Sequence, residues 1–577
     1  MSATCSWVLP FGATYLGDGR TRFRLWAPNQ KSVDVQIDQS APLPMASAAD
    51  GWFELETACR PGASYTYRLG TGQSAPDPAS RAQAEDVHGP SLVVDPASYR
   101  WQQTGWLGRP WHEAAIYELH VGLCGGFAGV QADLDRLSSL GITAIELMPI
   151  NDFPGQRNWG YDGVLPFAPD HAYGKPDQLK TLIDQAHQRR LMVYLDVVYN
   201  HFGPDGNYLG SYAPGFFRND VKTPWGAAID FRQPAVRRYF IENALYWLME
   251  YRFDGLRFDA VHAIADRTFL DEMAAEIRRT VERGRHVHLM LENDENDAGH
   301  LRHGFDAQWN DDAHHALHVL LTGETDGYYG DYAREPARQL LRCLTEGFAY
   351  QGEASTYRKG KGRGSPTGGL SPTAFILFLQ NHDQIGNRPH GDRLTTLAHP
   401  AALKAAAALQ LLCPTIPLLF MGEERSSRTP FQFFTDHHGE LAVAVREGRR
   451  REFGDFAAFG GEQIPDPNAQ ETFERSRPVP NGDDSPYRKL LALRQQFIVP
   501  RLPGTHAIGG EVVGPAAVIA RWRMGDGAVL SIATNLGAED RHSAIPAGPR
   551  LFTTEPAPAA RDTMPARSTT VVLEPRP

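Results

Sequence analysis

Between about residue 115 and residue 422, short apolar runs alternate with longer stretches that show an apolar face at helical spacing. Runs of about four to eight apolar residues indicate buried strands, and the longer stretches indicate amphipathic helices. Because strands and helices alternate strictly, we expect a parallel sheet, and the number of strands favours a closed (β/α)8 TIM barrel, an α/β fold. The predicted strands are Ala115–Val121, Ala144–Ile150, Leu191–Tyr199, Gly255–Val261, His288–Asn293, Phe305–Trp309, Phe375–His382 and Ile416–Gly422. The predicted helices are Val130–Leu140, Asp177–Arg190, Val236–Tyr251, Phe269–Arg283 and Ala401–Leu412.

Both ends of the chain show a different pattern, in which apolar and polar residues alternate with period two. This pattern predicts a small β-sandwich on each side of the barrel, so we expect domains over residues 1–105, 106–484 and 485–577. The N-terminal sandwich is interpreted either as a sugar-binding or site-shaping module or as a structural lid. The C-terminal sandwich is expected to pack on the barrel. Residues 76–96 contain four prolines and are predicted to form an extended linker.

Composition limits the possible functions. The 577 residues carry a formal net charge of −11, which argues against a nucleic-acid partner. The five cysteines are scattered and form no Cys-x-x-Cys pair, which favours a reducing compartment and no zinc site. No apolar run approaches the roughly 18 residues of a membrane span, and the N-terminus does not resemble a signal peptide. We therefore expect a cytoplasmic protein with no membrane partner, metal or cofactor. The glycine-rich segment 360–369 is predicted to be a solvated loop in preference to a phosphate site.

Polar side chains occur at the ends of four predicted strands. One strand ends in Asp196 and is followed by Asn200 and His201; the other ends carry Arg257 with Asp259, Glu292, and Asn381 with His382 and Asp383. In a parallel barrel these strand ends meet at one mouth. Arg257 and Asp259 lie two residues apart on one strand, so we expect them to be in contact. Carboxylates crowded at one mouth repel each other, so at least one pKa should rise.

These four segments resemble the four signature regions of the α-amylase family, glycoside hydrolase family 13. The resemblance implies that Asp259 is the nucleophile, Glu292 the general acid/base and Asp383 the stabiliser of the transition state. A retaining enzyme of this kind needs its two reacting carboxyls about 5–5.5 Å apart. We expect Arg257 to keep Asp259 ionised, and the surroundings of Glu292 to raise the pKa of Glu292.

Other residues are expected to bind the sugar. His201 and His382 are suited to hydrogen-bond hydroxyls of the cleaved ring, and Arg257 lies beside them. Tyr161 matches the aromatic residue that stacks on this ring in the family, and Asp162 follows it in the same glycine-rich segment. Asp196 is expected to brace its strand end. Asn200 is either a structural residue or a candidate ligand of a calcium site, and we favour the interpretation without a metal.

Longer stretches, Asn158–Tyr173, Phe305–Tyr332 and Met421–His437, resemble the family members that release trehalose from maltooligosyltrehalose. The resemblance implies hydrolysis of the α-1,4 bond next to the terminal trehalose unit, with shortened maltooligosaccharides as co-product, downstream of the synthase that makes the substrate. A glycogen branching or debranching enzyme remains an alternative. A non-catalytic glucan-binding protein is a third, against which the intact triad of acids argues.

The trehalose end should be recognised by loops after the later strands. For each candidate residue, packing within a loop is at least as good an interpretation. The candidates are Asp311, Asp312, His314, Glu324, Glu423 and Phe431. Arg425 follows Met-Gly-Glu-Glu, where relatives carry an aromatic residue, so one distal subsite is expected to be altered.

Overall fold

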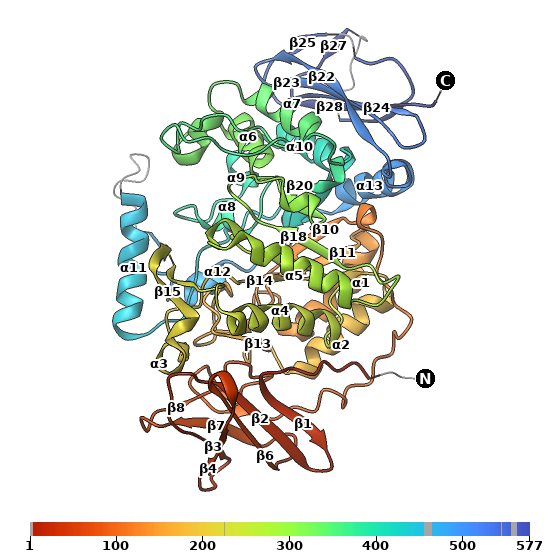
Figure 1. Ribbon diagram of the computed structural model, residues 1–577. Helices are drawn as coiled ribbons and strands as arrows, with labels where there is room; N and C mark the ends of the chain where they lie inside the picture. The colour runs from red at the N-terminus through yellow and green to blue at the C-terminus, as the bar shows by residue number, and fades with distance from the viewer. Residues whose placement is uncertain (1–3, 224, 455–463, 544, 555–561, 577) are drawn as a thin grey trace.

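A closed barrel of eight parallel strands lies at the centre of the molecule (Figure 1). The computed structural model describes residues 4–223, 225–454, 464–543, 545–554 and 562–576. The strands follow one another around the barrel in chain order, and the last one pairs with the first. They are β10 (Ile116–Leu119), β11 (Ala144–Leu147), β14 (Met192–Val197), β17 (Gly255–Phe258), β18 (His288–Leu291), β19 (Ala307–Trp309), β20 (Phe375–Leu377) and β21 (Ile416–Phe420). The prediction of a (β/α)8 barrel is confirmed.

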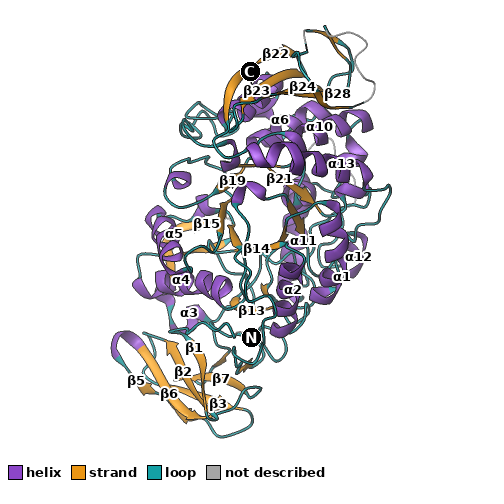
Figure 2. Ribbon diagram, turned by 90° about the vertical axis from the view of Figure 1, so that its right-hand side faces the viewer, coloured by secondary structure: helices purple, strands orange, loops and turns teal. Residues whose placement is uncertain are grey.

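Helices surround these strands on both sides in the turned view (Figure 2). In the first of them, Leu134, Leu137 and Leu140 are buried, as their spacing predicts. The helices after successive strands are α1 (Gly126–Leu140), α2 (Pro176–Gln188), α4 (Pro234–Met249), α5 (Arg267–Thr280), α6 (Asp311–Thr322), α7 (Pro336–Glu346) and α10 (Pro400–Leu412). The sequence pattern predicted neither α6 nor α7. In α6 four fifths or more of the residues are buried, including three histidines, so no polar stripe marks it as a helix.

The N-terminal module contains two antiparallel sheets and lies at one end of the barrel (Figure 1). One sheet contains β1 (Gly12–Gly17), β2 (Arg20–Trp26), β6 (Trp52–Ala58) and β5 (Ala46–Ser47). The other contains β4 (Leu43–Pro44), β3 (Val33–Ile37), β7 (Ser64–Leu69), β8 (Ser74–Ala75) and β9 (Ser91–Leu92). The prediction of a linker over 76–96 is wrong, because this segment packs tightly: Asp77, Ser80 and Arg81 are buried, and Arg81 forms an ion pair with Glu250 of the barrel.

The C-terminal part forms a five-stranded sheet and a two-stranded sheet at the opposite end of the molecule (Figure 1). Met564 of the small sheet packs on Ile519 and Ala533 of the large one, which makes a small sandwich. The large sheet contains β22 (His506–Gly514), β23 (Ala517–Arg523), β24 (Val529–Asn535), β28 (Ser568–Glu574) and β26 (Arg550–Thr553). The small one contains β25 (Arg541–His542) and β27 (Thr563–Met564).

Further elements are inserted between barrel strands or follow the last one. They are the hairpins β12 (Asn151–Asp152) with β13 (Leu165–Pro169) and β15 (Phe217–Thr223) with β16 (Gly226–Ile229), and the helices α3 (Leu209–Tyr212), α8 (His382–Gly386), α9 (Leu394–Leu397), α11 (Gly439–Gly454), α12 (Gln470–Arg475) and α13 (Ser485–Leu493). Within the described ranges, no helix combines the length and apolar character needed to cross a membrane.

Candidate active site

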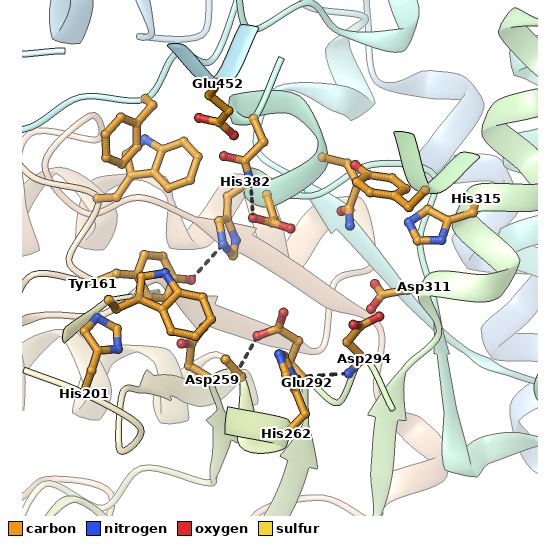
Figure 3. A pocket seen from close by; sticks show the side chains of 18 of the residues that line it. Tyr161, His201, Asp259, His262, Glu292, Asp294, Asp311, His315, His382 and Glu452 are labelled. Atoms are coloured by element: carbon orange, nitrogen blue, oxygen red, sulfur yellow. Dashed lines mark hydrogen bonds between the residues drawn. The ribbon is translucent and has the colours of Figure 1, made fainter. Parts of the chain in front are cut away.

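A cavity of about 630 Å³ opens at the carboxyl ends of the barrel strands. Side chains from β17, β18 and α8 converge on it, and Figure 3 shows Asp259, Glu292 and His382 around one space. The predicted site residues that line it are Tyr161, Asp162, His201, Asp259, Glu292, Asp311, His382 and Asp383. Segments more than 200 residues apart in the sequence thus meet at the barrel mouth, as the alternation of strands and helices predicts.

Arg257 organises the floor of this cavity. Its guanidinium is buried and donates to both carboxylate oxygens of Asp196 at 2.8 Å, to Asp259 Oδ1 at 2.8 Å and to Glu292 Oε2 at 2.8 Å. Arg257 Cζ lies over the ring of Trp309, 4.2 Å from the ring centre. Asp259 and Glu292 are therefore neighbours, each bound to a different nitrogen of one cation. The predicted contact between Arg257 and Asp259 is present.

The residue after Asp259 has an unusual backbone conformation that serves the site. Ala260 lies in the left-handed region with φ +40°, which is costly for a residue with a Cβ. This conformation directs the Ala260 N–H to Glu292 Oε2 at 2.8 Å. The backbone strain is thus coupled to the position of the Glu292 carboxylate.

Crowding shifts the pKa values of Asp259 and Glu292, but each shift has the opposite direction to the one expected. Burial and the Glu292 carboxylate raise the pKa of Asp259 well above its usual range, despite Arg257. Burial alone would raise the pKa of Glu292, but Arg257, His262 and the Ala260 N–H lower it below its usual value. These directions contradict the expectations that Arg257 keeps Asp259 ionised and that the surroundings of Glu292 raise its pKa. The reason is that one guanidinium is divided among three carboxylates.

His382 and Tyr161 form a second wall. Tyr161 donates to Asp196 Oδ2 at 2.6 Å, lies 2.9 Å from His382 Nε2, and stacks on the imidazole with ring centres 5.1 Å apart (Figure 3). The other imidazole nitrogen, Nδ1, bonds to the buried carboxylate of Glu118. Burial lowers the pKa of His382, but Glu118 more than offsets this, so the pKa is raised. Asp196 is buried and bonded to Arg257 and Tyr161, as its predicted bracing role requires.

Asp383 is held at the start of the short helix α8. The Asn381 side chain caps this helix by accepting from the N–H groups of Asp383 and Gln384 at 3.0 and 3.2 Å. Asn387 donates to Asp383 Oδ1 at 2.5 Å. Burial raises the pKa of Asp383, which His382 partly counteracts. The cap explains why Asn381 precedes the acid: it fixes the backbone that carries Asp383.

His201 and Asp162 occupy a third side of the cavity. His201 Nδ1 lies 2.9 Å from Asn200 Oδ1, and the ring of Trp225 stacks on the imidazole with centres 5.5 Å apart. Asn200 Nδ2 in turn reaches Asp259 Oδ2 at 3.4 Å, so Asn200 serves as a bridge between His201 and Asp259. Asp162 accepts from Asn158 Nδ2 at 2.7 Å. These contacts hold both side chains at the edge of the space beside Asp259.

Of the six residues considered for the trehalose end, only Asp311 lines the cavity. Glu423 is buried elsewhere, between Gln380 and Tyr487, so the structure does not bring this predicted substrate-binding residue to the site. The remaining candidates also pack away from the cavity: Asp312 on Arg363, His314 on Leu379, Glu324 on Arg388 and Phe431 on Trp159. Arg425 does not line the cavity, which removes the basis for an altered subsite at this residue.

The segment 360–369 is mostly an exposed loop, as its composition predicted, but Arg363 and Thr367 within it are buried. Arg363 is buried and forms ion pairs with Asp312 and Asp294, and together with Arg358 it lines the cavity. The burial of Arg363 was not predicted, because glycines dominate the local composition. Residues that the sequence analysis did not select also line the cavity: Trp225, His262, Asp294, Tyr328, Tyr357, Asn387, Phe433, Arg449 and Glu452. His262 and Asp294 lie within the strand-end motifs, and Tyr328 and Phe433 lie within the longer stretches 305–332 and 421–437, so these four had a signal in the sequence.

Comparison with known proteins follows the same division of the chain. Residues 10–96 match the carbohydrate-binding module 48 (isoamylase N-terminal domain), residues 82–213 the alpha amylase catalytic domain, and residues 505–573 a domain of unknown function. A barrel with clustered acids at its mouth, preceded by this module, defines a glycoside hydrolase of the α-amylase class. The most similar relatives narrow the class further.

Two curated relatives are malto-oligosyltrehalose trehalohydrolases. The protein from Deinococcus radiodurans is 42% identical over 84% of this chain and 83% of its own length. That from Saccharolobus solfataricus is 39% identical over 85% of this chain and 87% of its own. A crystal structure titled as a putative alpha amylase from Salmonella typhimurium is 45% identical, with a TM-score of 0.93 over 98% of this chain and 100% of that one. The chain belongs to the malto-oligosyltrehalose trehalohydrolase family.

Proposed function

We propose that this enzyme hydrolyses the α-1,4-glucosidic bond next to the terminal trehalose unit of maltooligosyltrehalose, releasing trehalose and a shortened maltooligosaccharide. The observation that carries the proposal is the pair Asp259 and Glu292, bound side by side to Arg257 in the cavity of a chain whose full-length relatives carry this name. A branching or debranching activity has less support: the curated relatives at 39–42% identity that cover more than four fifths of the chain are named for trehalose release, whereas a curated 1,4-alpha-glucan branching enzyme covers only 44% of it.

In the proposed mechanism Asp259 is the nucleophile and Glu292 the general acid. Asp259 attacks the anomeric carbon while Glu292 protonates the leaving oxygen, which departs as a hydroxyl of trehalose. Glu292 then takes a proton from water, and the water oxygen displaces Asp259 from the glycosyl ester. Both acids and Arg257 are restored. Asp383 is proposed to bind hydroxyls of the same ring and to hold them more strongly in the transition state.

The pKa directions of Asp259 and Glu292 fit this scheme if substrate binding places one proton on Glu292. Burial and the Glu292 carboxylate raise the pKa of Asp259, which favours one proton shared between the two acids. The glycosidic oxygen offers an acceptor beside Glu292, so we propose that binding transfers the proton to Glu292 and leaves Asp259 ionised. The pair then titrates as one unit with two apparent pKa values.

The remaining assignments follow from the same site. Tyr161, Asp162, His201, Arg257, His382 and Asp311 are proposed to position the substrate, and domains are proposed over 1–105, 106–484 and 485–577. The substrate implies a maltooligosyltrehalose synthase upstream. The five free cysteines support a cytoplasmic location.

The first test identifies products. The purified enzyme is incubated separately with maltotriosyltrehalose and with amylopectin, and products are separated by chromatography. We expect trehalose and maltotriose from the first, and no change of branching in the second. Proton NMR at early times should show the new reducing end as the α anomer, because a retaining mechanism preserves the configuration. An initial β anomer would contradict the double displacement.

The second test compares two glutamates. Glu292→Gln should lower kcat about 10²–10⁴-fold, because the amide cannot donate the proton. Glu423→Gln is a matched control, since Glu423 is also buried but lies outside the cavity, and its turnover should stay within about twofold of the parent. Undiminished turnover in Glu292→Gln, or an equal loss in both variants, would refute the assignment.

A further inference from the structure

The segment that carries Tyr161 is closed at its base by a small hairpin. Strands β12 and β13 pair antiparallel, with Asn151 opposite Pro169 and Asp152 opposite Leu165. Between them, residues 153–164 form the loop that brings Tyr161 and Asp162 to the cavity. In both overall views β13 lies on the side of the barrel nearest the N-terminal module (Figures 1 and 2). The contacts that hold the hairpin together therefore determine where the loop places Tyr161 and Asp162 at the cavity.

Three metal-ligating side chains meet at this base. Asp152, Asp170 and His171 each offer one ligand atom, and these atoms lie within 4.8 Å of one another. Asp152 and Asp170 are fully buried, whereas the His171 side chain is 21% exposed. Ligand atoms about 2.0–2.2 Å from one ion lie at most about 4.4 Å apart, so small side-chain shifts bring these three atoms within reach of one ion. The exposed edge of His171 gives the ion a path from solvent.

One carboxylate oxygen in the cluster has no protein partner. Asp152 Oδ2 is buried and makes no hydrogen bond, although its other oxygen accepts from the His171 N–H at 3.2 Å and lies 3.1 Å from His171 Nδ1. Both oxygens of Asp170 are used, by the N–H groups of Phe153 and Ala172 at 3.1 and 2.8 Å. A buried carboxylate oxygen without a partner is costly, so its presence needs an explanation.

The charge of the cluster is also uncompensated. Within the described ranges, neither Asp152 nor Asp170 forms an ion pair with a lysine or arginine, and His171 is the one basic partner. Asp86 lies close enough to interact electrostatically with both carboxyls and adds a third acid to the group. Three acids thus face one imidazole. A bound cation would neutralise this charge and would occupy the free position on Asp152.

We propose that Asp152, Asp170 and His171 bind one divalent transition-metal ion, of the Mn²⁺ or Zn²⁺ type, which fastens the base of the Tyr161 loop. Two carboxylates and an imidazole form a mixed oxygen–nitrogen set, and the imidazole favours these ions over Mg²⁺ or Ca²⁺. Ca²⁺ also requires six to eight oxygen ligands, about twice what the three side chains supply. The ion is structural: it lies apart from Asp259 and Glu292 and takes no part in bond cleavage.

Calorimetry tests the proposal without reference to activity. The full-length, untagged enzyme is treated with EDTA, desalted and titrated at pH 7.5 with MnCl₂, ZnCl₂, CaCl₂ and MgCl₂. We expect one saturable site for Mn²⁺ or Zn²⁺, and a melting temperature that rises with the concentration of that ion because the ion binds only the folded chain. His171→Asn should weaken binding at least about tenfold by removing a ligand.

Matched variants separate this site from adventitious binding. Asp152→Asn should also lose the site; because its side chain is buried, His171→Asn, with its partly exposed ring, provides the measurement if Asp152→Asn does not fold. Asp271→Asn is the control, since Asp271 faces His300 at 2.9 Å as Asp152 faces His171, but no third ligand joins that pair. Binding in Asp271→Asn should equal that of the parent. Absence of saturable Mn²⁺ or Zn²⁺ binding, binding of Ca²⁺ alone, or full binding in both site variants would overturn the proposal.

Discussion

At the scale of single residues, the division of Arg257 among three carboxylates determines how the site holds its proton. Asp196 takes two hydrogen bonds from this guanidinium, whereas Asp259 and Glu292 take one each. A buried arginine that faced Asp259 alone would lower the pKa of that acid. Because Arg257 is shared, burial and repulsion between the acids prevail, and Asp259 keeps a raised pKa.

This balance predicts a shift in the pH profile of Asp196→Asn. The Asp196 charge raises the pKa of Asp259, so neutralising it should lower that pKa. The pair then loses its shared proton at a lower pH, and the basic limb of kcat/KM should move down by about one pH unit. Tyr161→Phe is the control, because it removes the hydrogen bond to Asp196 but leaves the charge. A basic limb that moves upward, or that moves equally in both variants, would contradict the argument.

The sequence predicted which residues form this cluster, but it did not predict the directions of their pKa shifts. Arg257 lies on β17 and Asp259 follows its last residue, so the spacing of two along an extended segment predicted their contact. Asp196 is brought beside Arg257 by the register of β14 on β17, and Glu292 by the pairing of β17 with β18. Register between strands far apart in the chain is not encoded by local pattern. The number of acids sharing Arg257, and hence the pKa order, therefore required the structure.

At the scale of elements, inserted segments build the walls of the cavity while the barrel builds its floor. The β15–β16 hairpin carries Trp225, which is 44% exposed and lies against His201. Helix α11 approaches from another side with Arg449 and Glu452, and Glu452 is visible at the rim in Figure 3. One face of Trp225 stacks on His201, and the exposed part of the ring beside the cavity offers stacking area for a sugar.

Trp225→Ala should therefore weaken substrate binding more than it slows bond cleavage. Loss of a stacking face costs about 0.5–1.5 kcal/mol, which corresponds to a rise in KM of roughly two- to twelvefold with kcat nearly unchanged. Trp225→Phe keeps an aromatic face and should retain most of the affinity. Steady-state kinetics on maltotriosyltrehalose measure both constants. A fall in kcat at unchanged KM would show that Trp225 acts on the transition state instead.

Elements with a clear period were predictable, and inserted elements were not. Asp196 and Arg257 lie on barrel strands, and Asp259 and Glu292 follow them directly. The apolar runs of these strands are unmistakable. Trp225 lies in a hairpin rich in polar residues, and α11 has a polar sequence, so neither segment has the pattern of a buried element. The burial of Arg363 within an otherwise exposed loop was not predictable for a related reason: its partners Asp312 and Asp294 lie about 50 and 70 residues earlier in the chain.

At the scale of the whole molecule, the N-terminal module is attached to the barrel through buried charges. Arg81 pairs with Glu250 of the segment after α4 and donates to the Trp7 carbonyl at 2.8 Å, and Lys180 Nζ of α2 lies 3.6 Å from Glu250. Trp7 also donates its N–H to Glu250 at 3.2 Å. The side chains of Arg81 and Glu250 are 4% and 1% exposed, so neither charge can be solvated if its partner is lost.

Removing Arg81 should loosen the whole N-terminal module. Arg81→Ala leaves Glu250 buried beside Lys180 alone, and breaking a buried pair in this way costs about 3–5 kcal/mol. Because Arg81 lies in the segment that joins module and barrel, we expect calorimetry to show the module unfolding in a separate transition at lower temperature. Arg20→Ala is the matched control: Arg20 pairs with Asp18 and Glu56 on the exposed surface of the same module, and exposed pairs contribute little. If the two variants melt alike, the buried charges do not hold the module, and its attachment must depend on apolar contacts such as that of Phe11 with Tyr239.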